Sequence, residues 1–304
     1  MSRTPQRGSG TITDLEAAVR QERTQRVAIH ADKLPPIPGL TITDHLIPGT
    51  GDGVQVRVRV YRPDARPSLL PLAVYMHGGS FVLGSLDMVH ESAAGLALSA
   101  GAVIVSVGYR LAPVPPFPAG LHDCYNALEW AATHAGELGA DQARIGLARV
   151  SAGATLALGV ALLARDRGGP ALRFQSVVMP ANDDRPDAPS MRGAVDTPVW
   201  NRPLAVQSWR LYLGDGVAAD QYAAPSRAED LAGLPPTYFL RRGRRGSAAR
   251  RGHPPGAATH AGGGRARRPA RLRGRGALLP RPGPRHSAPR QRRPDPGAAP
   301  RTLR

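Results

Sequence analysis

The chain has 304 residues and a formal net charge of +17, and this charge is distributed very unevenly. Residues 1–240 hold 21 lysines and arginines against 22 aspartates and glutamates, whereas residues 241–304 hold 19 arginines and a single acid, Asp295. The length suits one large α/β domain or two small ones. A single cysteine, Cys124, excludes an intramolecular disulfide and is typical of a reducing compartment, so we expect a cytoplasmic protein. No apolar run reaches transmembrane length, roughly 18 residues, so we expect no membrane span.

The spacing of apolar residues predicts an α/β fold with a mostly parallel sheet. Residues 12–30 have helical spacing, and two alternating segments at 41–47 and 54–61 are typical of antiparallel strands with one solvated face. Unbroken apolar runs then alternate with helical patterns, which indicates buried parallel strands with helices on both faces of the sheet. In chain order we expect a strand at 72–76, a helix at 88–100, a strand at 102–107, a helix at 120–135, a strand at 144–148, a helix at 152–166 and strands at 176–180 and from 237 to 240.

Composition divides the chain into three parts. Residues 1–40 are expected to form an N-terminal helical cap, and residues 41–240 an incomplete α/β domain with an irregular insertion at 183–224. Residues 241–304 contain 11 glycines and 10 prolines but no aromatic residue, valine, isoleucine or methionine. Such a segment buries too little apolar surface to offset its ordering entropy, so we predict a disordered tail.

Three strings of residues indicate a catalytic site. His-Gly-Gly-Ser at 77–80 follows a buried strand, where glycines let the backbone approach a substrate and turn N–H groups toward a developing oxyanion. A tight strand-to-helix turn would also explain a lone pair of glycines. The strings YRLAPVPPFPA at 109–119 and RVSAGA at 149–154 favour the functional interpretation. Together the three resemble the hormone-sensitive-lipase-like family of α/β-hydrolase esterases, in which they read HGGG, YRLAPEHPFPA and GDSAGG or GESAGG.

This resemblance covers roughly residues 12–240 and implies a serine ester hydrolase that acts on short-to-medium acyl esters through an acyl-enzyme. By resemblance, Ser151 is the nucleophile, in a sharp strand-to-helix turn that exposes its Oγ. The backbone amides of Gly79, Ser80 and Ala152 would form the oxyanion hole. A helix N-cap is the structural alternative for Ser151. The implied partner is a small ester substrate, with no cofactor and no metal.

The turn around Ser151 departs from the family's pattern. Arg149 replaces its first glycine, Val150 replaces the acidic residue before the serine, and Ala154 replaces its last glycine. The first glycine lets the strand and the following helix approach closely, so a long charged side chain there should clash or force the turn open. Ser80 in place of the third glycine of HGGG is a milder change, because only its amide is required.

A serine nucleophile also needs a histidine as general base and a carboxylate that orients it. In the family both follow the strand that begins here at Thr237. The sequence has no acid between Asp230 and Asp295, so we assign neither group. The late histidines, His253, His260 and His286, lie among arginines, glycines and prolines that match nothing in the family.

The tail has the composition of GC-rich coding DNA read out of frame, because Arg, Gly, Ala and Pro have the codons CGN, GGN, GCN and CCN. In a shifted frame the codons of residues 246–254 permit Asp-Pro-Leu-Arg-Asp-Glu-Gly-Ile, which is the family's own string. Residues 279–282 similarly permit Phe-His-Gly. We interpret the tail as the product of a frameshift near residue 240 that replaced the catalytic Asp and His.

Three functions therefore stay open. The first is an esterase that is impaired in this chain, and the second is a catalytically dead hydrolase remnant. The third is non-specific nucleic-acid binding through the arginines of the tail, which would attract phosphate with a steep dependence on salt. The tail has no stacking aromatics and no helical periodicity, so we expect no specific nucleic-acid partner.

Overall fold

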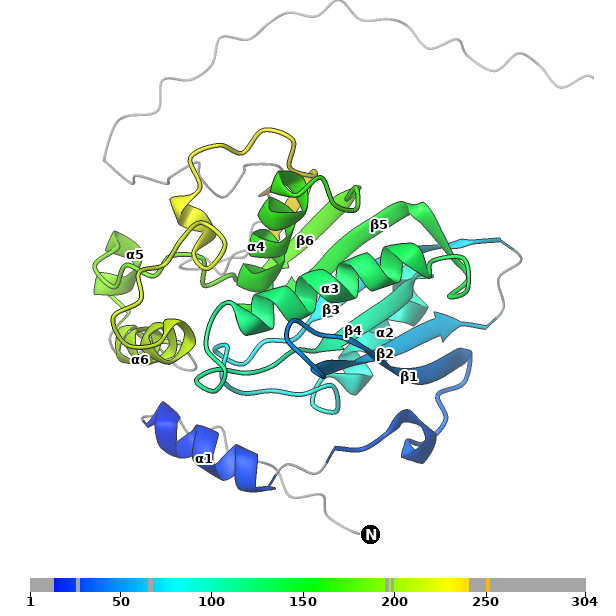
Figure 1. Cartoon of the computed structure of the whole chain (residues 1–304), viewed down its shortest axis with the longest axis horizontal. Coiled ribbons are helices and arrows are strands. Elements are labelled where there is room, and N and C mark those ends of the chain that lie inside the picture. The colour runs from blue at the N-terminus through cyan, green and yellow to red at the C-terminus, as the bar shows by residue number, and fades with distance from the viewer. Residues whose placement is uncertain are drawn as a thin grey trace, which may run out of the picture. The chain divides into compact units, whose positions relative to one another are not determined.

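A mixed sheet organises the part of the chain that the structure describes. The structure is a computed structural model, and it describes residues 14–25, 28–64, 68–194, 197, 200–240 and 250–251. Eight strands in these residues follow the order β1-β2-β4-β3-β5-β6-β7-β8 (Figure 1). They are β1 (Leu40–Pro48), β2 (Gln55–Pro63), β3 (Leu70–Met76), β4 (Val103–Gly108), β5 (Ala140–Val150), β6 (Phe174–Val178), β7 (Thr237–Leu240) and β8 (Arg250–Arg251).

The pairing of the strands confirms the predicted fold class. β1, β2 and β4 pair in antiparallel fashion, whereas β4, β3, β5, β6 and β7 form a parallel block. The central strands β3 and β4 are buried on both faces, which explains their unbroken apolar sequences. Because parallel strands all end at the same edge, the residues that follow β3, β5 and β6 come together there.

Helices cover both faces of the sheet. They are α1 (Leu15–Gln25), α2 (His90–Ala100), α3 (Ala119–Thr133), α4 (Ala152–Asp166), α5 (Pro189–Arg192) and α6 (Arg202–Leu213), with short 3-10 turns at Ala31–Lys33 and Pro225–Arg227. α3 and α4 lie over one face of the sheet and α2 over the other (Figure 1). Each face has its own core, with Val105, Leu128 and Leu156 on the α3–α4 side and Tyr61, Ala93 and Ile104 on the α2 side.

The first helix is shorter than the predicted segment 12–30. α1 begins after Asp14, whose side chain accepts a hydrogen bond from the amide of Ala17 at 2.9 Å. Its buried residues Leu15 and Val19 join the core on the α3–α4 side. The amide of Leu15 donates to Gln207 of α6 at 3.1 Å, so α1 is attached to α6.

The predicted irregular insertion at 183–224 is more regular than expected, because it contains α6. The side chain of Asn201 accepts from the amide of Leu204 at 2.9 Å and caps this helix, and a proline lies in its first turn. These residues form a helix-start signal that the irregular appearance of the surrounding sequence obscured. β5 is also longer than the strand predicted at 144–148.

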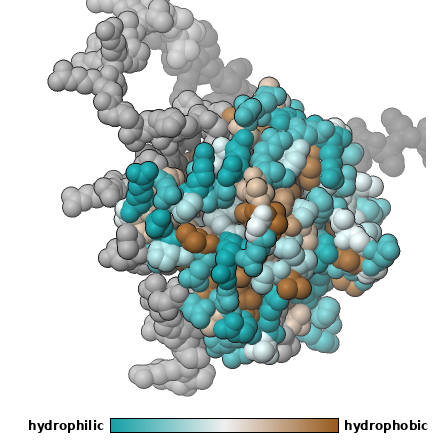
Figure 2. Space-filling view, turned by 60° about the vertical axis from the view of Figure 1, so that its left-hand side comes forward, coloured by the Kyte–Doolittle hydropathy of each residue, from teal (hydrophilic) through white to brown (hydrophobic). Residues whose placement is uncertain are grey.

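On the face shown in Figure 2, hydrophobic areas are small and interspersed among hydrophilic ones. No helix among the described residues is long and apolar enough to cross a membrane. The predicted disordered tail at 241–304 lies outside the described residues, apart from β8, which pairs with β7.

Candidate active site

Ser151 lies between the end of β5 and the start of α4, at the edge where the parallel strands end. Its backbone has φ 55° and ψ −127°, a left-handed conformation that is costly for a residue with a side chain. The amide of Ser151 donates to Val178 of β6 at 2.9 Å, and its carbonyl accepts the amide of Ala154 at 2.8 Å. These bonds hold the strained turn that the sequence predicts for a serine nucleophile.

Residues 77–84, which we call the oxyanion loop, pack directly on this turn. A Cβ atom added to Gly78 would lie 3.3 Å from Cβ of Ser151 and 3.2 Å from the carbonyl oxygen of Val150. A Cβ atom on Gly153 would lie 2.1 Å from the carbonyl oxygen of Met76, at the end of β3. The structure therefore brings the HGGS and SAG strings into contact.

The oxyanion loop has an unusual backbone. Gly79, Ser80 and Phe81 have φ angles of 134°, 55° and 67°, three consecutive left-handed residues. The carbonyl of Gly79 accepts hydrogen bonds from Val82 at 3.1 Å and Leu83 at 2.8 Å, which close the loop. A glycine adopts such angles at no steric cost, so Ser80 adds strain to the loop where the family has its third glycine.

The string at 109–119 supports the oxyanion loop through contacts of Tyr109 with His77. The Tyr109 hydroxyl donates to the carbonyl oxygen of buried His77 at 2.8 Å, and the two rings stack with centroids 4.3 Å apart. Arg110 binds the fully buried carboxylate of Asp123 through its amide at 2.8 Å and through its guanidinium at 2.7 Å. In the structure, this string therefore supports the oxyanion loop.

Arg149 is buried behind the candidate nucleophile. Arg149 is 3% exposed, and its Nη2 atom donates a hydrogen bond to the carbonyl oxygen of Leu147 on the same strand. Nε and Nη1 have no hydrogen-bond partner among the described residues. Burial lowers the pKa of Arg149 well below its ordinary value. The turn at Ser151 keeps its strained backbone, so the cost of Arg149 is an unsatisfied guanidinium rather than the opened turn that the sequence analysis expected.

A general base for Ser151 is not found in the described part of the chain. No hydrogen bond joins Oγ of Ser151 to a histidine there, and the Nδ1 atom of nearby His77 lies 2.8 Å from the carbonyl oxygen of Gly78. The three late histidines lie outside the described residues. Among the described residues, no cluster of three or more His, Cys, Asp or Glu side chains could hold a metal ion.

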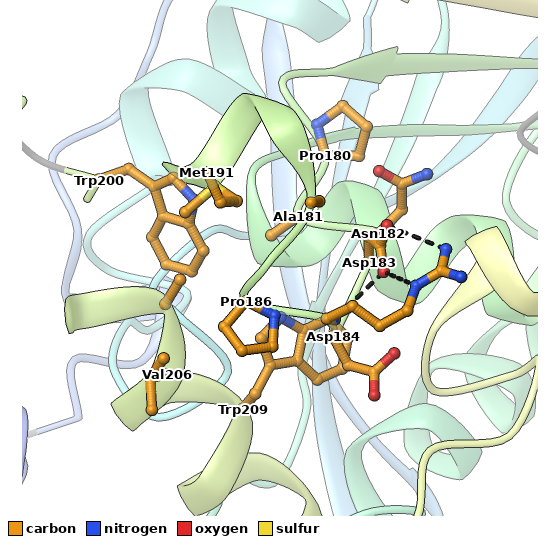
Figure 3. Close-up of a pocket in the computed structure, with 13 residues that line it drawn as sticks. Pro180, Ala181, Asn182, Asp183, Asp184, Pro186, Met191, Trp200, Val206 and Trp209 are labelled. Carbon is orange, nitrogen blue, oxygen red and sulfur yellow. Dashed lines mark hydrogen bonds and ion pairs between the residues drawn. The ribbon is translucent and has the colours of Figure 1, made fainter. Parts of the chain in front are cut away.

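A small cavity of about 100 Å³ opens just after β6, next to the strand that holds the Ser151 amide. Figure 3 shows Trp200 and Val206 on one side of it and Asp183 on another. The Asp183 carboxylate accepts a hydrogen bond from Arg185 at 2.8 Å. Prolines 180 and 186 and Met191 add further apolar surface. The cavity therefore has an apolar wall and a polar wall, the latter formed by Asn182, Asp183, Asp184 and Arg185.

A second, larger cavity of about 400 Å³ lies beside the end of β4 and is bordered by α1. The Glu22 carboxylate accepts the amide of Gly84 at 3.0 Å, and Arg23 donates to the carbonyl oxygens of Leu111 at 3.2 Å and Ala112 at 3.3 Å. α1 thus contacts the oxyanion loop as well as α6. Neither cavity has Ser151, Gly79, Ser80 or Ala152 among its lining residues.

Comparison with known proteins agrees with this geometry. Residues 73–244 match a family described as having the alpha/beta hydrolase fold. Carboxylesterase NlhH of Mycobacterium tuberculosis is 39% identical over 221 residues, which are 70% of this chain and 69% of the relative. Esterase LipI of the same species is 38% identical over 206 residues, which are 66% of this chain and 64% of the relative.

Solved structures give the same result. A bacterial heroin esterase is similar with a TM-score of 0.68 and 38% identity, over 74% of this chain and 73% of that chain. Esterase LipW from Mycobacterium marinum is similar with a TM-score of 0.62 and 38% identity, over 74% of this chain and 66% of that chain. The protein described here is therefore a member of the hormone-sensitive-lipase-like family of α/β-hydrolases, whose members are carboxylic ester hydrolases.

Proposed function

We propose that Ser151 is the nucleophile of this ester hydrolase, that the amides of Gly79, Ser80 and Ala152 form its oxyanion hole, and that turnover is impaired in this chain. The observation that supports this proposal most directly is the contact between the oxyanion loop and the strained turn at Ser151. A serine in that conformation next to a glycine-rich loop is the arrangement that acyl transfer requires.

In the proposed reaction, Oγ of Ser151 attacks the ester carbonyl and loses its proton to solvent water, because no base for it is found among the described residues. The carbonyl oxygen becomes an oxyanion, which accepts hydrogen bonds from the three amides. The carbon–oxygen bond to the alcohol then breaks, the alcohol leaves with a proton, and the acyl group stays on Ser151. Water hydrolyses this acyl-enzyme and releases the acid.

The proposed impairment follows from the absence of a base for Ser151 in the described residues and from the composition of the tail. An oxyanion hole and substrate binding alone give about 10³–10⁴-fold acceleration over water, whereas an intact triad gives far more. We therefore expect measurable but slow hydrolysis of activated esters. A catalytically dead remnant is the alternative that the same experiment identifies.

We propose that the cavity after β6, whose lining does not include Ser151, receives the end of a short acyl group. Its volume of about 100 Å³ is below the roughly 150 Å³ of an engineered apolar cavity that holds benzene. Acetyl to butyryl groups should therefore fit this cavity, whereas an octanoyl group should not. This prediction concerns the acyl side of the substrate only.

The test is hydrolysis of p-nitrophenyl acetate, butyrate and octanoate by the full chain and by Ser151→Ala. We expect slow hydrolysis of the two shorter esters by the full chain and a lower rate for Ser151→Ala, which keeps only the acceleration that the oxyanion hole and binding supply. Equal rates for the two proteins would mean that Ser151 does not act as a nucleophile, which is the dead-remnant alternative. A rate within tenfold of an intact relative would show that another base acts and that the chain is not impaired.

The remaining parts of the proposal concern the cap, the tail and the location. We propose a cap within residues 1–40, a hydrolase domain within 41–240 and an arginine-rich tail at 241–304, whose adhesion to polyanions is non-specific. Salt titration of binding to unrelated DNA sequences tests this, because non-specific binding depends steeply on salt and not on sequence. A cytoplasmic location is proposed on the single cysteine, and cell fractionation tests it.

A further inference from the structure

Three aromatic rings connect α6 to the oxyanion loop. The ring of Phe81, which is 1% exposed, stacks on Tyr212 with centroids 4.0 Å apart and planes at 14°. Trp209 contacts both rings, at 5.3 Å from Phe81 and 5.7 Å from Tyr212. We call Phe81, Trp209 and Tyr212 the aromatic cluster. It joins two segments that are far apart in the sequence.

Phe81 needs such support because of its backbone. It follows Ser80, and both residues have left-handed φ angles that cost free energy unless the surroundings impose them. The carbonyl of Phe81 accepts the amide of Ala112 at 3.1 Å, which fixes the backbone on one side. The ring stack on Tyr212 fixes the side chain on the other.

Tyr212 is itself held in place from several directions. Its carbonyl accepts the amide of Phe117 at 2.7 Å, and the Phe117 ring meets the Tyr212 ring edge-on at 5.6 Å. The side chain is almost fully buried, and its hydroxyl has no hydrogen-bond partner among the described residues. The hydroxyl therefore contributes nothing that a phenylalanine would lose, and the ring is what the contact with Phe81 uses.

Trp209 has a second role at the same place. It lines the cavity after β6 and also contacts Phe81, so a group that fills the cavity rests on a ring of the aromatic cluster. Trp209 thus contacts both the cavity and the loop that carries the Ser80 amide.

From these contacts we propose that Tyr212, with Trp209, is a positioning residue that holds the Ser80 amide in the oxyanion hole through its stack on Phe81. The inference rests on the proposed function for its catalytic consequence. The structural part, namely that α6 fixes the oxyanion loop, stands on the ring contacts alone.

The first test measures the loop directly, by hydrogen exchange and mass spectrometry of peptides that cover residues 77–84. In Tyr212→Ala, the amides of Val82 and Leu83 should exchange at least about tenfold faster, because the loop opens locally without its support. Tyr212→Phe should keep the exchange rates of the wild-type chain. Tyr61→Ala is the matched control, because Tyr61 is a fully buried tyrosine in the core on the opposite face of the sheet.

The second test measures the Ser151-dependent hydrolysis of p-nitrophenyl acetate by the full chain and the same variants. In Tyr212→Ala we expect kcat to fall by about tenfold or more with KM nearly unchanged, since an oxyanion donor acts mainly in the transition state. Tyr212→Phe should restore kcat, and Tyr61→Ala should leave it unchanged.

The two tests separate the two ideas. If the wild-type chain and Ser151→Ala hydrolyse the ester equally, the proposed function fails, and hydrogen exchange still decides whether α6 holds the loop. If loop exchange in Tyr212→Ala matches that in Tyr61→Ala, or if kcat and KM change together in both variants, then Tyr212 only stabilises the fold and the inference is wrong.

Discussion

Gly153 and Met76 touch through their backbones, so closely that a methyl group on Gly153 would lie 2.1 Å from the Met76 carbonyl oxygen. Gly153 is in the first turn of α4, and Met76 ends β3 immediately before the oxyanion loop. This contact sets the distance between the helix that follows Ser151 and the strand that carries the loop. Only a residue without a side chain at position 153 therefore lets α4, which follows Ser151, pack this closely against the end of β3, which precedes the oxyanion loop.

Gly153→Ala should therefore destabilise the fold by about 1–3 kcal/mol, the usual cost of overpacking a tightly packed core. Gly95→Ala is the matched control, because Gly95 is also helical and a Cβ atom there would meet nothing within 4 Å. That control should stabilise the chain by up to about 1 kcal/mol through helix propensity. Urea unfolding of both variants measures the difference, and equal effects would mean that α4 can move away from β3.

Arg149→Gly should stabilise the chain by about 1–3 kcal/mol, because it removes buried donors that have no partner. The pKa of Arg149 is lowered by burial, so the unfolded chain binds a proton more readily. The destabilisation by Arg149 should accordingly be fully present below its folded pKa and should decrease as the pH rises from that value toward the unfolded one. Urea unfolding at several pH values measures this.

Arg144→Gly serves as the control for Arg149→Gly. Arg144 is on the same strand, but its side chain is 48% exposed and pairs with Asp141 at 2.7 Å. Removal of Arg144 should destabilise the chain slightly, since glycine weakens a strand. If both variants lost stability, the guanidinium of Arg149 would have to be satisfied in solution.

The sequence predicted the fold because its central strands and helices are locally consistent. Alternating and unbroken apolar runs identified β1 to β6, and the strand predicted from 237 to 240 is β7. The contact between the HGGS and SAG strings followed from the family resemblance and from the rule that parallel strands end at one edge.

Other features could not be predicted because they depend on tertiary contacts. The capping of α6 by Asn201 is a signal in the sequence, but the stack of Tyr212 on Phe81 depends on how the insertion folds back over the loop. The position of Arg149 is a further example. Its side chain was expected to open the turn, whereas the structure buries it with the turn intact and leaves two of its nitrogens unsatisfied.

Acid should unfold this chain partly through Asp44. This carboxylate accepts two hydrogen bonds from the fully buried Arg59, at 2.7 and 3.0 Å. Burial tends to raise the pKa of Asp44, but the bonds from Arg59 and the Ala31 amide and the charges of Arg59 and Arg57 outweigh it, so the pKa is lowered. A lowered carboxyl pKa contributes stability above its unfolded value, about 3.9, and this stability is lost as the pH falls through the folded value.

Asp44→Asn should therefore lower the free energy of unfolding at pH 7 by about 3 kcal/mol, the lower end for a broken buried pair, because Asp87 still contacts Arg59. At pH 2–3 the variant and the wild-type chain should approach each other in stability. Asp141→Asn, at an exposed pair, should change the unfolding midpoint little at either pH. A loss of equal size at both pH values would show that the charge of Asp44 is not its source.

The last prediction concerns repair of the reading frame after residue 240, which should restore the catalytic Asp and His but leave Arg149 behind Ser151. Four full-length proteins are compared by their turnover of p-nitrophenyl butyrate: the present chain, Arg149→Gly, the frame-repaired chain and the chain with both changes. Arg149→Gly alone should gain little, because no base for Ser151 is found in the part of the chain that the structure describes. Frame repair alone should gain part of the activity, because an unsatisfied guanidinium behind the turn costs order at the nucleophile. The combined protein should exceed the product of the two separate gains, since nucleophile, base and carboxylate act as a unit.

Full activity from frame repair alone would show that Arg149 is harmless, and no gain from frame repair in either background would contradict the frameshift interpretation.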